Sequence, residues 1–208
     1  WMPKPCWAIL KFEIEPAERG SGVHYKSNIS VDDVARKYQN EVEETIEKSL
    51  KQGIKGWEVT DLNIRLIEGE DHEVHSRPGD FKIATPMGIM NGLQNGGTTL
   101  LEPILSFVIK ADEELLGNVS SDIIKMRGTF ESPMIEDGRF VLKGTLPLAT
   151  SQDYAVKLSS RSGGRASIST SFLEYRPCTD DEGVIREYRG ISPLDEAKWI
   201  LKARGAMQ

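Results

Sequence analysis

One loop of this sequence carries the side chains best suited to chemistry. Residues 72–77 read His-Glu-Val-His-Ser-Arg, between a predicted strand and a predicted helix. Two imidazoles three positions apart with carboxylates nearby could hold a metal ion, although no third firm ligand follows. The metalloprotease motif H-E-x-x-H is excluded, because the second His comes one residue early. A long polar loop between two rigid elements either carries function or is a solvated connection.

The remaining reactive side chains have no partner at a recognisable catalytic spacing. No nucleophile–base pair stands out, and G-x-x-x-x-G-K-[ST] is absent, since the glycines at 96–97 and 163–164 lack the following Lys-Ser/Thr. Cys6 and Cys178 have no metal-ligand spacing, and we expect two thiols rather than a disulfide. The sequence therefore predicts neither an enzyme nor a GTP site in this chain.

Composition and charge describe a globular chain that is not a broad nucleic-acid binder. Of 208 residues, 38% are hydrophobic and 28% charged, which is enough apolar material for packed cores. The net charge is −6, and Lys and Arg number 12 against 16 acidic residues up to position 98 and 14 against 16 beyond it. Any RNA contact must therefore be local. No membrane span or signal peptide is visible, and we expect a cytoplasmic protein without a membrane partner.

The elements around the loop follow from hydrophobic periodicity. Alternation predicts strands over 7–15, 23–29 and 58–67. Ser30 and Asp33 resemble a capping box before a long amphipathic helix that ends at Gly53. A second helix is predicted over 80–93, and Asn95-Gly96-Gly97 marks the domain boundary. The buried stripe of the first helix is predicted to be Val34, Tyr38, Val42, Ile46 and Leu50, and Tyr38, Trp57 and Phe81 are interpreted as core or boundary aromatics.

The second half has the element order of a ferredoxin-like domain, β-α-β-β-α-β. The predicted strands cover 100–110, 128–135, 139–147 and 165–175, and the predicted helices cover 112–125 and 151–160. A tail from residue 178 leads to a final helix over 193–204, with Ser192 as its cap and Pro193 at its first position. The predicted domains are thus 1–97, 98–177 and the tail 178–208, in an α+β chain.

Several separated motifs, in order from Trp7 to Tyr175, resemble domains IV and V of elongation factor G and of its relatives, the tetracycline-resistance ribosomal protection proteins. They are IEP at 14–16, GSG at 20–22, HEV at 72–74, FKIA at 81–84, LLEPI at 100–104 and GR at 164–165. The protection proteins are favoured by QGIKGWEVTD at 52–61, GTTLLEP at 97–103, the tail that ends in a helix, and the lack of a Gly-rich loop before Trp7. The tip at 72–76 instead resembles elongation factor G, so a translocase paralogue is the alternative.

The resemblance implies a fold and a role. It implies a ribosomal protein S5 domain 2-like βαβ domain with a left-handed crossover, against the usual rule, then a ferredoxin-like domain and a C-terminal helix. It also implies that one strand of the first domain lies upstream of residue 1. The resemblance implies that the chain is the ribosome-binding part of a monomeric translational GTPase that releases tetracycline. It also implies that GTP with Mg is bound by an N-terminal domain outside this chain. A small enzyme or a metal-binding module is the alternative from another class.

The resemblance also assigns the candidate contacts. The loop becomes a fingertip at the decoding region of the small ribosomal subunit, where irregular RNA is recognised by stacking and polar contacts. Because Glu70, Asp71 and Glu73 repel phosphate, the contact must use shape or bases. The residues assigned to this RNA contact are His72, Glu73, Val74, His75, Ser76 and Arg77.

Two groups of basic residues are further candidates for ribosome contact. Lys157, Arg161 and Arg165 surround a Gly-Gly turn that the resemblance places towards the stalk base of the large subunit; ordinary solvated charge is the alternative. The final helix carries Lys198, Lys202 and Arg204, which the resemblance places near RNA, with the helix helping to hold the fingertip. Simple docking of that helix is the alternative, since cations also suit a last helical turn.

Overall fold

The computed structural model describes residues 6–179 and 181–206, which divide into two compact units. Residues 1–98 and 184–208 belong to the first unit, and residues 99–183 belong to the second. The tail at 178–208 is therefore shared: its first six residues group with the second unit, and the rest returns to the first. No helix within the described ranges has the length and apolar character that a membrane span needs.

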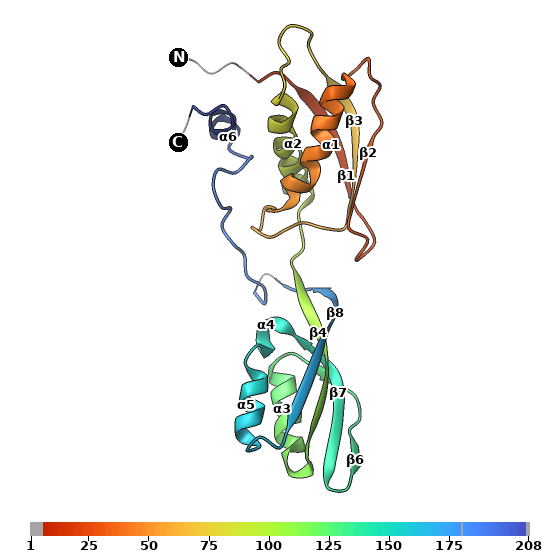
Figure 1. Ribbon diagram of the computed structural model, residues 1–208, viewed down its shortest axis with the longest axis vertical. Coiled ribbons are helices and arrows are strands. Elements are labelled where there is room, and N and C mark those ends of the chain that lie inside the picture. The colour runs from red at the N-terminus through yellow and green to blue at the C-terminus, as the bar shows by residue number, and fades with distance from the viewer. Residues whose placement is uncertain (1–5, 180, 207–208) are drawn as a thin grey trace. The chain divides into compact units, whose positions relative to one another are not determined.

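The first unit is a three-stranded sheet with two helices on one face (Figure 1). The central strand β3 pairs antiparallel with β1 and parallel with β2. The predicted stripe is confirmed within α1, where Tyr38, Val42, Ile46 and Leu50 are at most 4% exposed, and Val34 is also buried but precedes the helix. Tyr38 and Phe81 stack with ring centroids 4.7 Å apart in the same core. The elements are β1 (Ile9–Pro16), β2 (Val23–Ser27), α1 (Arg36–Leu50), β3 (Leu62–Glu70), α2 (Asp80–Gly96) and α6 (Glu196–Ala203).

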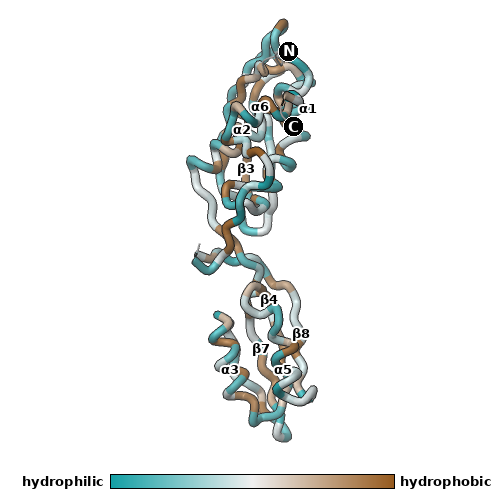
Figure 2. The backbone as a smooth tube through the Cα atoms, turned by 90° about the vertical axis from the view of Figure 1, so that its left-hand side faces the viewer, coloured by the Kyte–Doolittle hydropathy of each residue, from teal (hydrophilic) through white to brown (hydrophobic). Residues whose placement is uncertain are grey.

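The second unit is an antiparallel sheet in the order β5-β7-β4-β8, with β6 also paired to β7. Helices α3 and α5 cover one face (Figure 1), and hydrophobic and hydrophilic stretches alternate along the elements (Figure 2). This is the ferredoxin-like arrangement, so the predicted α+β class is confirmed. The elements are β4 (Leu101–Asp112), a 3-10 turn (Glu113–Leu115), α3 (Leu116–Lys125), β5 (Thr129–Phe130), β6 (Met134–Glu136), β7 (Arg139–Pro147), α4 (Leu148–Ser151), α5 (Tyr154–Arg161) and β8 (Ser167–Pro177).

Two predicted boundaries in the first unit were wrong. The third strand starts at Leu62 rather than at residue 58, because Asp61 adopts a left-handed conformation (φ 59°) that interrupts an extended chain. The capping-box bonds between Ser30 and Asp33 form, with Ser30 N–H donating to Asp33 Oδ2 (3.0 Å). They close a separate turn, however, and α1 starts only at Arg36, with no side-chain cap.

Three other predicted elements also differ. The strand expected at 128–135 is split into β5 and β6, since Pro133 has no N–H to donate to β7. The helix expected at 151–160 is two helices, because Asp153 leaves helical geometry (φ −101°, ψ 2°). The final helix starts at Glu196 and not at Pro193, and its cap is Asp195, whose side chain accepts from Lys198 N–H.

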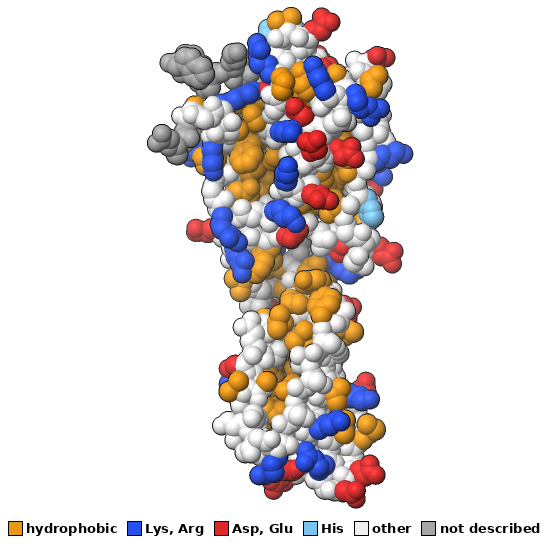
Figure 3. All heavy atoms as spheres, viewed as in Figure 1, with side chains coloured by type: hydrophobic (Ala, Val, Ile, Leu, Met, Phe, Trp, Pro, Cys, Tyr) orange, Lys and Arg blue, Asp and Glu red, His pale blue; other side chains and the backbone are white. Residues whose placement is uncertain are grey.

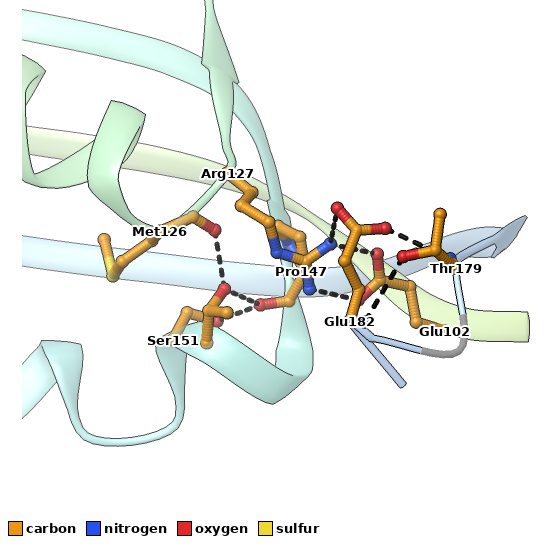
Figure 4. Close-up of polar contacts among 8 residues, drawn as sticks. Glu102, Met126, Arg127, Pro147, Ser151, Thr179 and Glu182 are labelled. Carbon is orange, nitrogen blue, oxygen red and sulfur yellow. Dashed lines mark hydrogen bonds and ion pairs between the residues drawn. The ribbon is translucent and has the colours of Figure 1, made fainter. Parts of the chain in front are cut away.

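An ion-pair network fastens one end of the second unit (Figure 4). Arg127 donates from both terminal nitrogens to the largely buried Glu102, over 2.8 and 2.7 Å. The same guanidinium lies 3.4 Å from Glu182, which in turn accepts from Thr179 N–H. Bidentate pairing of this kind is strong and directional. It ties the turn after β8 to β4 and to the turn between α3 and β5.

Asp61 gives a pH-dependent prediction for the first unit. Burial by itself would raise the pKa of Asp61, but hydrogen bonds from the Gly20 and Gly22 amides outweigh it, and the pKa is lowered. A lowered pKa means that ionised Asp61 stabilises the fold above its unfolded pKa, and that this stability is lost as pH falls through the folded pKa. We expect Asp61→Asn to cost about 1–2 kcal/mol at pH 7 by urea unfolding, with the difference shrinking as pH falls through the lowered pKa of Asp61.

Asp137→Asn is the matched control for Asp61→Asn. Asp137 also has a positive φ (51°) and lies in the turn before β7, and asparagine tolerates this conformation as aspartate does. An equal, pH-independent loss in both variants would contradict a stabilising charge at Asp61.

Candidate functional site: the loop between β3 and α2

The loop formed by residues 71–79 has a defined internal structure. Ser76 N–H donates to the carbonyl of His72 (2.9 Å), and His72 N–H donates to Ser76 Oγ (2.9 Å). His72 Nδ1 accepts from the amides of Val74 (3.1 Å) and His75 (3.3 Å). An imidazole nitrogen that accepts hydrogen bonds carries no proton, so neutral His72 has its proton on Nε2. Residues 72–76 therefore form one closed turn.

The tip of this turn presents side chains to solvent. Glu73, Val74 and His75 are exposed, and Val74 is 67% accessible. The His72 and His75 rings stack with centroids 4.3 Å apart, and Trp7 meets the His72 ring edge-on at 5.3 Å. Arg77, on the descending side, is also exposed. Five of the six predicted loop residues thus reach or approach the surface.

Ser76 does not fit its predicted role as a residue that contacts RNA directly. It is only 8% exposed, and its hydroxyl donates to the carbonyl of Trp7 (2.9 Å). Its own carbonyl accepts from the hydroxyl of Tyr38, in α1 (3.1 Å). Ser76 therefore holds the base of the turn and presents no side chain to a partner.

A buried carboxylate joins this loop to the rest of the first unit. Asp80, the first residue of α2, is 0% exposed. Its Oδ2 accepts from the amides of Trp7 (3.1 Å) and Arg77 (3.0 Å), and its Oδ1 accepts from Arg204. A buried charge is stable only when it is paired and hydrogen-bonded. The strand entry, the loop, α2 and the C-terminal helix meet at this one side chain.

Two nearby groups extend the anchor around Asp80. Glu41, in α1, accepts from the Gly79 amide with both carboxylate oxygens (2.9 and 3.0 Å). The thiol of Cys6 lies 3.5 Å from the Asp80 carbonyl. Burial raises the pKa of Cys6, while the nearby charge of Arg204 opposes the rise. Cys6 and Cys178 are both present as thiols.

The C-terminal helix is docked on α2, and only part of its charge is available. Trp199 donates its indole N–H to the carbonyl of Ile83 (3.0 Å). The Arg204 side chain is 18% exposed and is committed to Asp80, which does not suit the predicted ribosome contact. Lys198 pairs with Asp195 (2.6 Å), and Lys202 is exposed. Lys202 is therefore the member of this basic group that is best placed to meet an outside anion.

The basic group of the second unit is matched by acidic partners. Lys157 lies 2.7 Å from Asp153, and Arg161 lies 2.5 Å from Asp122. Arg165 donates to Asp112 (2.7 Å), which lowers the pKa of that carboxyl. Figure 3 likewise shows acidic and basic side chains interspersed on the face it draws. The three residues lie in and just after α5 but form a mixed-sign surface.

The described residues offer no prepared metal centre. Within residues 6–179 and 181–206, no group of three or more His, Cys, Asp or Glu side chains could hold an ion. His72 Nδ1, one of the ligand atoms considered from the sequence, is occupied by two backbone amides. The arrangement is suited to contact by shape, stacking and hydrogen bonding.

Sequence reasoning missed the anchor of the loop. The sequence predicts Asp80 only as the start of a helix, a position where a negative charge is favourable. Its partners Trp7 and Arg204 lie 73 and 124 positions away in the sequence, which no local pattern can indicate.

Trp57 also differs from a core residue: it is 39% exposed, and the Arg186 guanidinium covers its ring at 3.4 Å.

Two family models match consecutive parts of the chain. The model described as elongation factor G, domain IV, matches residues 3–97, and the model described as elongation factor G C-terminus matches residues 99–183. A crystal structure of a protein from Thermus thermophilus superposes with a TM-score of 0.70 at 25% identity, over 96% of this chain and 28% of that one.

Curated relatives match over nearly the whole chain. Tetracycline resistance protein TetP from Clostridium perfringens is 36% identical over 98% of this chain and 31% of its own length. Tetracycline resistance protein TetW from Butyrivibrio fibrisolvens is 33% identical over 96% of this chain and 31% of its own length. The chain therefore spans about a third of the length of these relatives.

The anchor at Asp80 predicts the effect of removing its partner. Arg204→Met leaves a buried carboxylate without its cation. We expect the free energy of unfolding to fall by about 3 kcal/mol, and undocking of α6 keeps the destabilisation from being larger. Hydrogen exchange should quicken at the amides of Ser76 and Arg77. The double variant Asp80→Asn/Arg204→Met should recover part of the stability, since no buried charge remains.

Lys202→Met is the control for this experiment, because it removes an exposed cation from the same helix. It should change stability by less than about 0.5 kcal/mol. Equal exchange rates at the loop amides in Arg204→Met and Lys202→Met would show that Asp80 does not hold the loop.

Proposed function

We propose a ribosomal role for this chain from one premise: it belongs to the elongation factor G family and carries domain IV followed by the C-terminal domain. The proposed function is to form the ribosome-binding part of a translational GTPase that releases tetracycline from the small-subunit decoding region. The relatives that support it are named tetracycline resistance proteins. Such a protein would work in the cytoplasm as a monomer, with the ribosome as its partner.

The observation that carries this proposal is the exposed, internally bonded tip of loop 71–79. Val74 and His75 project from a closed turn whose base is fixed by Ser76 and Asp80. A preorganised projection loses little conformational entropy on binding and can occupy the volume of a small ligand. The exposed His75 ring, stacked on His72, offers a flat face for a base, as RNA-binding proteins use aromatic rings.

Charge around the tip restricts the kind of RNA contact. Glu70, Asp71 and Glu73 lie in or beside the loop and repel phosphate oxygens. Only Arg77 supplies an exposed cation within residues 72–77. The proposed contact therefore uses base faces and steric fit, and a salt dependence smaller than that of a basic RNA-binding surface is expected.

The chemical step of the proposed cycle belongs to another domain. This chain lacks the G-x-x-x-x-G-K-[ST] sequence that holds nucleotide phosphates. GTP and Mg would be bound by an N-terminal domain outside it, where hydrolysis releases the factor. In the second unit, Lys157, Arg161 and Arg165 remain candidates for the large-subunit stalk base, recognised as a mixed-sign surface.

An elongation factor G-type translocase paralogue is the second candidate. The observation in its favour is the tip itself, where His72-Glu73-Val74 resembles elongation factor G more than the protection proteins. In that case the same tip would enter the decoding region without acting on a drug.

The tip is tested in the full-length protein with GTP, on tetracycline-inhibited ribosomes in a reconstituted translation system. We expect the intact factor to restore elongation. The variant Glu73→Ser/Val74→Gly/His75→Ser should lose this effect by about tenfold or more, because the projecting side chains are removed while the anchors stay. Peptide synthesis rate is the measurement.

Glu18→Ser is the control, an exposed change in the turn after β1. Full rescue by the triple tip variant would rule out the fingertip. Absence of rescue by the intact factor would favour the translocase paralogue.

A further inference from the structure

The outer edge of β2 is open in the first unit. β2 is the last strand of the order β1-β3-β2 and pairs with no other described strand (Figure 1). At the end of its ladder with β3, the Asn28 amide donates to the Leu66 carbonyl (2.9 Å). Since alternate residues of a strand face opposite neighbours, the backbone groups of Val23, Tyr25 and Ser27 point away from the sheet. An open strand edge is a template for another strand.

A groove runs beside this edge, between β2 and the helix α1. Its volume is about 270 Å3. Its lining combines apolar and aromatic side chains with exposed carboxylates. The lining residues are Val23, Tyr25 and Ile46 together with Glu43, Glu44 and Glu47.

Among the described residues, two of the three carboxylates form no close ion pair, although the charge of Glu47 acts on Lys51 four positions along the chain. Glu44 pairs with Lys82 (3.0 Å). Glu43 and Glu47 are exposed, and neither forms an ion pair within the described part of the chain. They stand four positions apart on α1, where like charges repel each other. A cationic ligand would relieve this repulsion.

The Tyr25 hydroxyl is a further unused group of the groove. Its oxygen is buried and has no hydrogen-bond partner among residues 6–179 and 181–206. Burial, followed by the charge of Glu43, raises the pKa of Tyr25 to about 12, and the neighbouring Ser27 side chain opposes the rise.

We propose that the β2 edge binds an extended, basic segment of another protein, which adds to the sheet as a fourth strand. Side chains two apart in a strand are spaced by about 6.6 Å, and residues four apart on a helix by about 6 Å. Lys or Arg at alternate positions of the segment would therefore meet Glu43 and Glu47. Backbone bonds to Tyr25 and its neighbours supply the pairing, as in other strand-addition complexes.

The chemistry of the groove favours a polypeptide over nucleic acid. Exposed carboxylates repel phosphate, whereas a free strand edge matches only another backbone. This inference goes beyond the proposed function of loop 71–79 and does not depend on it.

The experiment uses the 208-residue chain and a fluorescent peptide, acetyl-Lys-Val-Lys-Val-Lys-Val-Lys-amide, followed by anisotropy. The control peptide has the same sequence with N-methyl groups on alternate residues. This change keeps the charge but removes backbone hydrogen-bond donors. We expect saturable binding that N-methylation weakens by about tenfold or more. Hydrogen exchange at the Tyr25 and Ser27 amides should slow when the unmodified peptide is bound.

Side-chain specificity is tested with Glu43→Gln/Glu47→Gln, against the control Glu18→Gln/Glu187→Gln, which removes two other exposed carboxylates. Binding should weaken about tenfold only in the first variant. Absence of saturable binding, equal binding of the N-methylated peptide, or equal loss in both double variants would overturn the proposal.

Discussion

The carboxylate of Asp80 is fully buried, and its two oxygens bond the amides of Trp7 and Arg77 and the guanidinium of Arg204. Burying a charge has a large desolvation cost, which is offset only when all of these donors are in place. The entry to β1, the end of loop 71–79, the start of α2 and the C-terminal helix are therefore positioned together. A change in any of these segments that removes a donor acts on the loop through this single side chain.

The same arrangement separates support from contact within the loop. Ser76 and Asp80 turn their polar groups inward, and Tyr38 and Glu41 of α1 hold the loop from below. Glu73, Val74 and His75 are left exposed on a turn closed by its own hydrogen bonds. The tip residues can thus vary with the partner without altering the anchor, as is common where loops carry function on a rigid scaffold.

Local patterns in the sequence predicted most of the elements but not the contacts that make the site. The stripe from Tyr38 to Leu50 was correct because a period near 3.6 reports directly on a buried helix face. Strand starts and helix caps were less accurate, since Asp61, Pro133 and Asp195 act through backbone geometry and single hydrogen bonds. The pairing of Asp80 with Arg204 joins residues 124 positions apart. Without knowledge of this pairing, the sequence predicts that Arg204 contacts the ribosome. In the same way, Arg161 and Arg165 suggest a basic cluster in the sequence because their partners Asp122 and Asp112 come from other elements, whereas Lys157 pairs with Asp153 at the start of its own helix.

The most direct test of the central claim is a photo-crosslink from position 74, which is 67% exposed. A photoreactive amino acid would replace Val74 in the full-length protein, bound with a non-hydrolysable GTP analogue to tetracycline-inhibited ribosomes, and crosslinked nucleotides would be mapped by reverse transcription. Our account predicts crosslinks in small-subunit RNA of the decoding region, and none there from the same group placed at Glu18. Crosslinks confined to other ribosomal sites, in a complex that is shown to have formed, would contradict it.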